Sequence, residues 1–268
     1  MDLVARHNIT FAGPEDGQPI VFAHGFGCDQ HMWRHVAPAF EQTHRVVLFD
    51  LVGSGGNTAE FDATTYGTLD GYAADVLEIV RGLGLRDVIF VGHSVSAMIG
   101  ALAQIEAPDL FDRLVMVGPS PRYIDDEAYV GGFDEPAIRG LLDALKSNYL
   151  GWSSSMAPLI VANPDRPELG AELTESFCRM DPEVAQVFAT ATFLSDHREI
   201  LPRISVPTLV IQCQDDVIAP VAVGEYVAAQ VPRSELVLLD ATGHCPNLSA
   251  PDETVDAIAR FLQLRPVA

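Results

Sequence analysis

The chain has 268 residues, of which 48% are hydrophobic and 20% charged, the composition of a folded globular protein rather than of a disordered chain. Its 37 acidic residues outnumber its 16 Lys and Arg residues, and the resulting net charge of −21 disfavours a nucleic-acid partner or an anionic membrane surface. The start MDLVARHNITFAGPED lacks the basic and apolar regions of a signal peptide, so none is expected. No apolar run is long enough to span a bilayer, and the four cysteines form no Cys-x-x-Cys pair. These features predict a cytoplasmic protein with reduced thiols.

Short apolar runs alternate with longer amphipathic segments, which is the pattern of a mostly parallel sheet flanked by helices. The segment 69–85 places Leu69, Val76 and Val80 on one helical face, and 252–263 repeats this spacing at the end of the chain. The sequence therefore predicts an α/β fold. The strands are expected at 19–23, 45–49, 87–91, 113–117, 207–212 and 235–239.

The alternation stops between about residues 120 and 205, where no convincing strand occurs. Four helices are expected there instead, at 135–149, 151–162, 167–178 and 181–195. A helical block inserted between two strands predicts a cap above the carboxyl edge of the sheet, where open α/β sheets bind ligands. We therefore expect a core domain made of residues 1–119 and 206–268, with a helical cap at 120–205 inserted into it.

The stretch FVGHSVSAMIG, residues 90–100, leads from an expected strand directly into an expected helix. This is the context of the nucleophile elbow G-x-S-x-G, in which small neighbours allow a sharp turn to expose a serine. Gly92 satisfies the pattern, whereas Ser96 replaces the second glycine. The pattern predicts that Ser94 is a nucleophile.

A serine hydroxyl needs a base, and the base needs an orienting acid. In the α/β-hydrolase order the acid follows the serine and the histidine comes last. His244 lies in a loop between the last expected strand and the last helix, where a mobile, exposed imidazole is expected. Asp215 and Asp216 both follow the strand before it. Asp216, four residues before Pro220, is favoured as the acid, with Asp215 as the alternative.

An acyl-transfer site must also stabilise an oxyanion with two backbone N–H groups. The residue after the nucleophile, Val95, is expected to supply one of them. The loop HGFGCD at 24–29 follows the first expected strand, and Phe26 is expected to supply the other. Large apolar side chains of the cap indicate an apolar pocket above Ser94. The predicted lining is Phe26, Phe133, Trp152, Met156, Phe188 and Phe193.

Other motifs do not indicate a metal or a cofactor. His31 and His35 have a zinc-compatible spacing but lack the Glu of H-E-x-x-H and a third ligand, so an exposed helix face is the better interpretation. The glycine-rich stretch 51–56 is neither a dinucleotide fingerprint nor a P-loop, and it is expected to be a turn. No metal and no nicotinamide, flavin or nucleotide cofactor is predicted.

Several stretches together resemble the RsbQ-like group of α/β-hydrolases, bacterial stress-response regulators related to the plant karrikin and strigolactone receptors. They are GHSVSAMIG with HGFG, GGFDEPAIRGLLDALKSNYLGW, FLSDHRE, QCQDDVIAP and GHCPNLSAPDET. The similarity covers nearly the whole chain, and the group shares the serine at the position of Ser96.

The resemblance implies a triad of Ser94, His244 and Asp216, an oxyanion hole from Phe26 and Val95, and a V-shaped four-helix cap over a closed apolar cavity. Two functions remain open. One is a serine hydrolase acting on a small apolar ester or butenolide-like lactone. The other is a ligand receptor in which hydrolysis is slow and a PAS-domain phosphatase is the partner. Carbon–carbon bond hydrolases also use a serine at this position and stay open as well.

Overall fold

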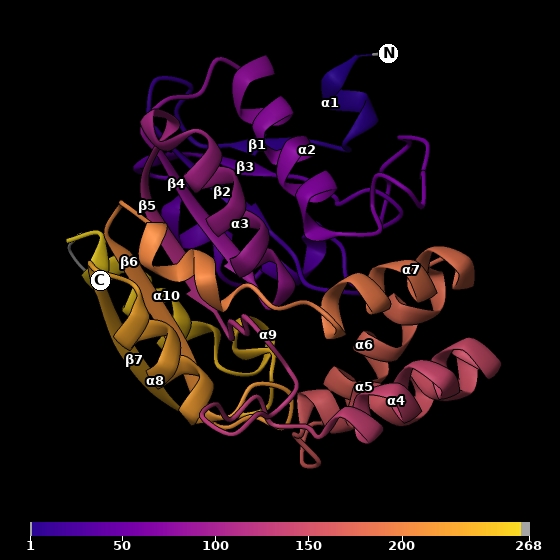
Figure 1. Ribbon diagram of the computed structural model, residues 1–268. Coiled ribbons are helices and arrows are strands. Elements are labelled where there is room, and N and C mark those ends of the chain that lie inside the picture. Colours follow the sequence, from indigo (N-terminus) through magenta and orange to yellow (C-terminus); the bar gives the residue numbers. More distant parts are fainter. Residues whose placement is uncertain (1, 264–268) are drawn as a thin grey trace.

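A computed structural model describes residues 2–263 of the protein and contains one sheet in the order β1-β3-β2-β4-β5-β6-β7 (Figure 1). Strand β1 pairs with β3 in antiparallel fashion, and all other neighbours are parallel. The predicted α/β class is confirmed. The strands are β1 (Thr10–Ala12), β2 (Gln18–Ala23), β3 (His44–Leu48), β4 (Val88–His93), β5 (Phe111–Val117), β6 (Thr208–Asp215) and β7 (Ser234–Thr242).

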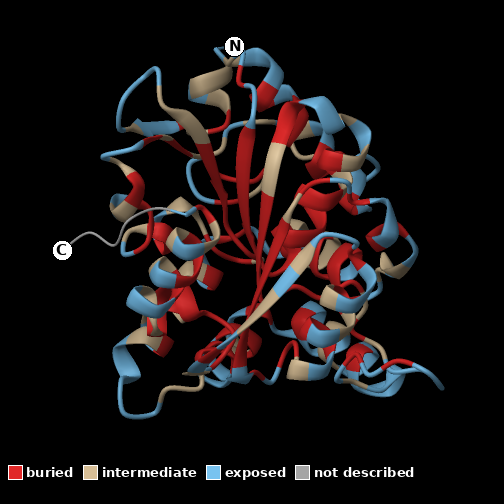
Figure 2. Cartoon of the chain, turned by 90° about the vertical axis from the view of Figure 1, so that its left-hand side faces the viewer, coloured by how far each residue is buried: buried red, intermediate tan, exposed pale blue. Residues whose placement is uncertain are grey.

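The six predicted strands are all present, because their β-branched and aromatic residues suit a sheet covered on both faces. Every residue of β4 is buried, and Figure 2 shows the centre of the sheet almost entirely in the colour of buried residues. Among the strands of residues 2–263, only β1 escaped prediction. It has three residues, two of them exposed, so neither a long apolar run nor an alternating pattern marks it. Its pairing with the edge of β3 defines it instead.

Helices flank the sheet. Helices α2 and α3 pack against each other, α3 also contacts β4 and β5, and α8 and α10 contact β6 and β7. The predicted amphipathic faces of the segments 69–85 and 252–263 account for α2 and α10. The α-helices are α1 (Leu3–Arg6), α2 (Leu69–Gly82), α3 (Val95–Glu106), α4 (Glu135–Ser147), α5 (Tyr149–Val161), α6 (Pro167–Arg179), α7 (Pro182–Phe193), α8 (Val221–Gln230), α9 (Pro246–Ser249) and α10 (Pro251–Phe261).

Four 3-10 helices complete the described elements, at Gln30–Trp33, Ala37–Phe40, Pro108–Leu110 and Arg198–Arg203. The prediction of one helix carrying both His31 and His35 was wrong, because the first two of these short helices take its place. Both histidines are nevertheless exposed, as expected. No helix within residues 2–263 is long and apolar enough to cross a membrane.

Helices α4 to α7, called the cap helices below, form a layer of their own beside one end of the sheet (Figure 1). They follow the four predicted segments within a few residues. Proline at the first or second position begins α4, α6 and α7, where a missing N–H costs no hydrogen bond. The division into core and cap at residues 120 and 205 stays a prediction.

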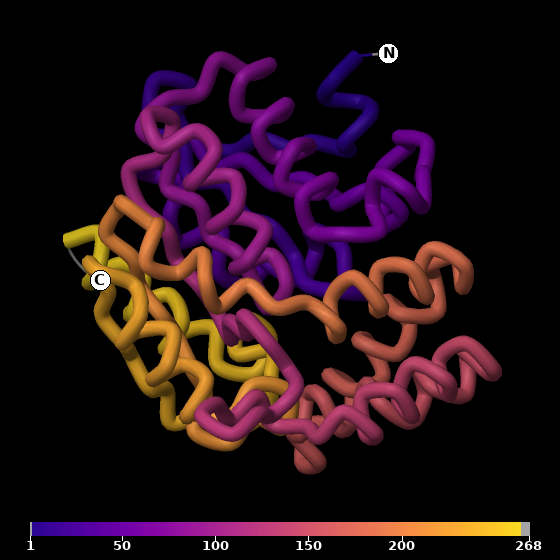
Figure 3. The backbone as a smooth tube through the Cα atoms, viewed as in Figure 1, coloured from indigo at the N-terminus to yellow at the C-terminus, as the bar shows by residue number. Residues whose placement is uncertain are grey.

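The chain enters the cap helices after β5 and leaves them before β6, and Figure 3 traces both connections. Four charged side chains join the two connections. Arg122 pairs with Asp196 at 2.9 Å, and Arg198 pairs with Asp196 at 2.7 Å and with Asp126 at 2.6 Å. An isolated β-bridge between Arg122 and Asp196 adds backbone contact. The two connections are thus tied to each other as well as to the sheet.

Candidate active site

Ser94 lies at the tip of a sharp turn between β4 and α3. Its backbone has φ +55° and ψ −122°, a conformation that non-glycine residues adopt only when the surroundings enforce it. Gly92 makes the turn sterically feasible, because a Cβ there would lie 2.4 Å from the Ser96 carbonyl oxygen and 2.8 Å from the Ala97 nitrogen. The turn therefore presents the Ser94 hydroxyl at the carboxyl edge of the sheet.

Ser96 has a definite structural task at the position that the elbow pattern gives to glycine. Its side chain is fully buried, and Oγ donates a 2.5 Å hydrogen bond to the carbonyl of His24. His24 directly follows β2, the first strand of the parallel core, and opens the loop 24–29. The hydroxyl therefore joins the elbow to that loop, which neither glycine nor alanine would do.

Three side chains form a hydrogen-bonded chain at this edge. Ser94 Oγ lies 2.7 Å from His244 Nε2, and His244 Nδ1 lies 2.7 Å from Asp216 Oδ2. An ionised carboxylate only accepts hydrogen bonds, so Nδ1 carries the proton and Nε2 is left to accept from the Ser94 hydroxyl. All three residues are buried. The expectation of an exposed His244 was wrong, because α5 lies against its loop and leaves it 4% exposed.

Asp216 is the acid that faces His244. Its Oδ1 accepts the backbone N–H groups of Ile218 at 2.8 Å and Ala219 at 3.0 Å. Burial by itself would raise the pKa of this carboxyl, but the adjacent His244 and these hydrogen bonds hold the pKa below its ordinary value. Asp215 is exposed, and its backbone carbonyl accepts the Gly243 N–H at 2.6 Å.

The loop that carries His244 is anchored to the end of α5. The His244 N–H donates to the Ile160 carbonyl at 2.8 Å. Gly243 has φ +93°, and a Cβ there would lie 1.9 Å from the Val161 carbonyl oxygen. Only glycine lets the two backbones approach this closely.

The loop 24–29 lies between the elbow and the cap helices. A Cβ on Gly25 would meet His93 at 2.6 Å, and a Cβ on Gly27 would meet the Phe177 ring of α6 at 2.3 Å. The half-buried Phe26 ring contacts Trp152 and Phe193, among other aromatic rings. Val95 begins α3, so its N–H is one of the first amides of the helix, which have no acceptor within it.

A small cavity of about 40 Å³ adjoins Ser94. Typical ligand pockets measure about 300–1,000 Å³, so a ligand of ordinary size must displace side chains to enter. Of the residues predicted for the substrate pocket, Phe26, Trp152 and Phe193 line this cavity. The further lining residues are Cys28, His93, Ser94, Tyr123, Ile160, Leu173, Phe177, Thr192, Ile218, His244 and Cys245.

Phe133, Met156 and Phe188 are not among the residues that line this cavity. Phe188 is fully buried and stacks on Tyr72 of α2 at 4.4 Å, so α7 turns it towards the core. Phe133 is half-buried and forms a bridge with Ile124, and Met156 is half-buried on α5. Apolar composition marks cap residues but does not tell which side of a helix faces the cavity.

Tyr123 is a lining residue without a sequence signal, since it lies in the irregular connection between β5 and α4. Its side chain is 1% exposed, and burial raises the pKa of its hydroxyl. The hydroxyl therefore stays neutral beside Ser94. Cys28 and Cys245, two of four free thiols, also line the cavity, and burial raises the pKa of each thiol.

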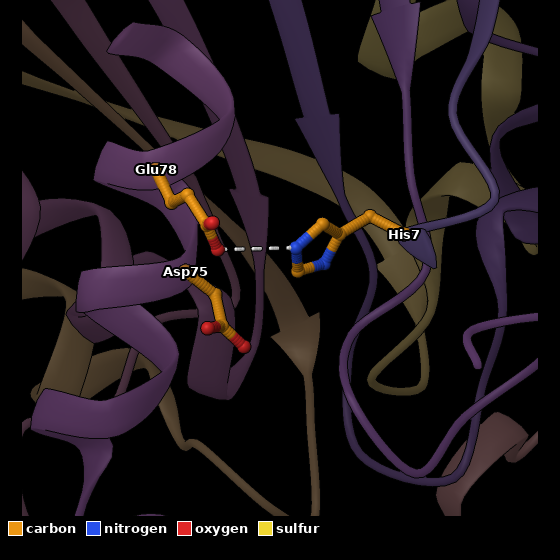
Figure 4. Close-up of side chains that lie close together, drawn as sticks. All are labelled: His7, Asp75 and Glu78. Carbon is orange, nitrogen blue, oxygen red and sulfur yellow. Dashed lines mark ion pairs between the residues drawn. The ribbon is translucent and has the colours of Figure 1, made fainter. Parts of the chain in front are cut away.

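One further cluster has the residue types of a metal site. His7, Asp75 and Glu78 place one ligand atom each within 4.8 Å of one another (Figure 4). Their present partners account for them without a metal. Glu78 is paired with Arg6, and the Asn57 amide nitrogen lies 3.2 Å from His7 Nδ1. That amide donates to Nδ1, so the proton of neutral His7 sits on Nε2, the atom that faces Glu78.

Comparisons with known proteins identify the family. The Alpha/beta hydrolase family matches residues 20–257. The chain belongs to this family. It is 42% identical over 257 residues to a strigolactone esterase of Arabidopsis thaliana, covering 95% of this chain and 96% of the relative. A probable esterase of Oryza sativa subsp. japonica is 40% identical over 259 residues, with 96% of both chains covered.

Two further proteins are similar to this α/β-hydrolase over nearly its whole length. A karrikin insensitive 2 receptor of Petunia hybrida is 39% identical and covers 96% of this chain and 95% of the relative. The solved structure of a hydrolase from Oleispira antarctica has a TM-score of 0.95 at 39% identity and covers 98% and 97% of the two chains. Family and relatives together identify a hydrolytic enzyme related to the plant receptors.

Replacing Gly243 by alanine should disrupt the contact between the His244 loop and α5. The new Cβ has no space against the Val161 carbonyl, and the positive φ adds strain, so the free energy of unfolding of this hydrolase should fall by about 2–4 kcal/mol. Urea denaturation measures the change. Gly140→Ala is the matched control, because Gly140 is exposed on α4 and nothing lies within 4 Å of its added Cβ. It should stabilise the protein by about 0.5–1 kcal/mol. Equal effects of the two substitutions would contradict the steric argument.

Asp75 makes stability depend on pH. Burial raises the pKa of its carboxyl to about 6, above the value of about 3.9 in an unfolded chain. The folded protein therefore holds this proton more tightly, and Asp75 favours folding increasingly as the pH falls from 7 to 4. Asp75→Asn should raise the free energy of unfolding at pH 7 by about 1 kcal/mol and flatten this part of the pH profile. Exposed Asp16→Asn should leave the profile unchanged.

Proposed function

We propose that this protein is a serine hydrolase that cleaves a small apolar ester or lactone through an acyl-enzyme on Ser94. The observation that carries the proposal is the chain of two 2.7 Å hydrogen bonds from Ser94 through His244 to Asp216. Ser94 and His244 face an apolar cavity rather than bulk solvent. Relatives named as esterases support the same reaction class.

In the proposed first half-reaction, Ser94 Oγ attacks the carbonyl carbon of the substrate while His244 Nε2 takes the hydroxyl proton. The resulting oxyanion accepts hydrogen bonds from the N–H groups of Phe26 and Val95. Collapse of the tetrahedral intermediate breaks the bond to the leaving oxygen, which takes the proton from His244. The acyl group then remains on Ser94.

The second half-reaction repeats these proton transfers with water. His244 takes a proton from the attacking water and returns one to Ser94 Oγ as the acid product leaves. Asp216 keeps the imidazole in the Nδ1–H tautomer and stabilises the imidazolium formed in each step. Its lowered pKa keeps the carboxylate ionised at neutral pH, as this role requires.

The lining of the cavity limits the proposed substrate to small neutral molecules. Most of its side chains are aromatic or aliphatic, and no Lys or Arg is among its lining residues. A charged substrate would lose its hydration without a compensating partner. A compact ester or a butenolide-like lactone satisfies this constraint, since its ester group can face Ser94 while the rest contacts aromatic rings.

Removing the Ser94 hydroxyl should abolish hydrolysis. Ser94→Ala should lower kcat on a short p-nitrophenyl ester by roughly a millionfold, because the nucleophile of a triad is lost. A fluorophosphonate should add one mass increment to the wild-type protein on Ser94 and none to the variant. Ser153→Ala is a matched control, since this buried serine donates to the Tyr149 carbonyl within α5 and does not line the cavity. Labelling of the wild-type chain at another serine would refute the assignment.

A second candidate function is that of a ligand receptor, with slow hydrolysis and a partner protein that recognises the ligand-bound state. Relatives named as karrikin insensitive receptors favour it. The small cavity favours it too, because a ligand that enters must displace side chains of the cap helices. In this proposal the protein acts in the cytoplasm like the RsbQ-like group, with a PAS-domain phosphatase as partner.

Hydrogen exchange on the Ser94→Ala variant tests the receptor candidate, because this variant should bind a ligand without consuming it. A simple methylbutenolide at saturating concentration should change the exchange of α5 and α6 amides several-fold, as side chains that line the cavity move. Wild-type protein treated with a fluorophosphonate carries a covalent group on Ser94, and its exchange shows the effect of an occupied nucleophile for comparison. Unchanged exchange in the cap helices, with binding shown by thermal shift, would exclude the receptor mechanism and leave the hydrolase proposal standing.

A further inference from the structure

His93 ends β4 and directly precedes Ser94, at a position that the elbow pattern leaves unspecified. Its side chain is only 2% exposed. Nε2 lies 2.7 Å from the backbone carbonyl oxygen of His244. Since a carbonyl oxygen only accepts, Nε2 must carry the proton and donate it. The two imidazole rings lie 5.2 Å apart, so the residue before the nucleophile contacts the residue proposed as the base.

The opposite edge of the His93 ring faces the loop 24–29. A Cβ on Gly25 would lie 2.6 Å from His93 Nδ1, so the backbone of this loop passes directly against the ring. Nδ1 has no hydrogen-bond partner among the described residues. Trp33 meets the ring edge-on at 6.5 Å. One imidazole therefore separates the loop that contains Phe26 from the loop that contains His244.

Two hydrogen bonds to the backbone of His244 hold this residue in place. Its N–H donates to the Ile160 carbonyl of α5, and its carbonyl accepts the Nε2–H of the His93 side chain at the end of β4. The first bond ties the histidine to the cap helices, and the second ties it to the sheet. Because Ser94 directly follows His93, the hydrogen bond from His93 links the backbone of the proposed base to the residue next to the proposed nucleophile.

We propose that His93 is a positioning residue, which sets the distance between the His244 imidazole and Ser94 by donating its Nε2–H to the His244 carbonyl. This inference rests on the proposed hydrolase function. Misplacing a catalytic group by about 1 Å can cost about a hundredfold in rate, so a single well-placed backbone hydrogen bond has a measurable effect.

The chemistry of imidazole fits this role. Burial, with the nearby His244, lowers the pKa of His93 to about 3, so the ring is neutral at every pH at which the enzyme would work. A neutral donor binds a carbonyl without placing a positive charge beside the imidazolium that forms on His244 during the reaction. A Lys or Arg at this position would oppose that charge. A glutamine amide, whose nitrogen reaches about as far as Nε2, would not.

Steady-state kinetics of two variants on a short p-nitrophenyl ester test the role. His93→Leu removes the donor and should lower kcat by about tenfold to a hundredfold, with KM changed less than twofold. His93→Gln retains a neutral donor and should recover most of this loss. Trp33→Phe is the control for packing around the ring, because it leaves the hydrogen bond intact. It should lower the melting temperature as His93→Leu does while leaving kcat within about threefold.

Equal losses of kcat in His93→Leu and His93→Gln, or a loss in Trp33→Phe as large as in His93→Leu, would overturn the positioning role in favour of a purely structural one. Nitrogen NMR of the wild-type protein gives a readout that needs no turnover. The His93 ring should show the Nε2–H tautomer and should not titrate above pH 5. A Nδ1–H tautomer would refute the inference even if Ser94 hydrolyses esters. Absence of Ser94-dependent hydrolysis with the expected tautomer would refute the proposed function instead.

Discussion

The end of α5 and the loop that carries His244 are in backbone contact, and the arrangement of the site depends on this contact. The His244 N–H bonds the last turn of α5, Gly243 lets the Val161 carbonyl approach, and the Asn163 amide donates to carbonyls on both sides of the junction. Ala162 ends the helix in the left-handed conformation so that the chain can turn away. A displacement of α5 therefore acts directly on the backbone of the proposed base.

Strain, burial and charge also meet in one small region because of the topology of the sheet. Parallel strands bring their carboxyl ends to one edge, so the elbow after β4, the acid after β6 and the histidine after β7 lie side by side. Burial of that edge strengthens the hydrogen bonds of Asp216 and lowers the pKa of His24 and His93, which keeps both rings neutral. The aromatic side chains around Phe26 then leave little open volume beside Ser94.

Much of the fold was predictable because its signals are local. Six strands and the cap helices follow from apolar runs, helical spacing and prolines, and the elbow follows from glycine and serine between a strand and a helix. The failures share one cause. Strand β1, the burial of His244, and the orientation of Phe133, Met156 and Phe188 depend on which distant element covers a residue. Tyr123 and His93 were missed for the same reason.

The sequence by itself determined the class of fold, the order in which serine, acid and histidine follow one another, and the apolar character of the cap. These features depend on residue type and on spacing along the chain. Tertiary structure alone decided which of two adjacent aspartates faces His244, why Ser96 replaces a glycine, and how small the cavity is. Each of those outcomes depends on contacts between segments far apart in sequence, as in the bonds from Ser96 to His24 and from His93 to His244. No local pattern encodes such distances.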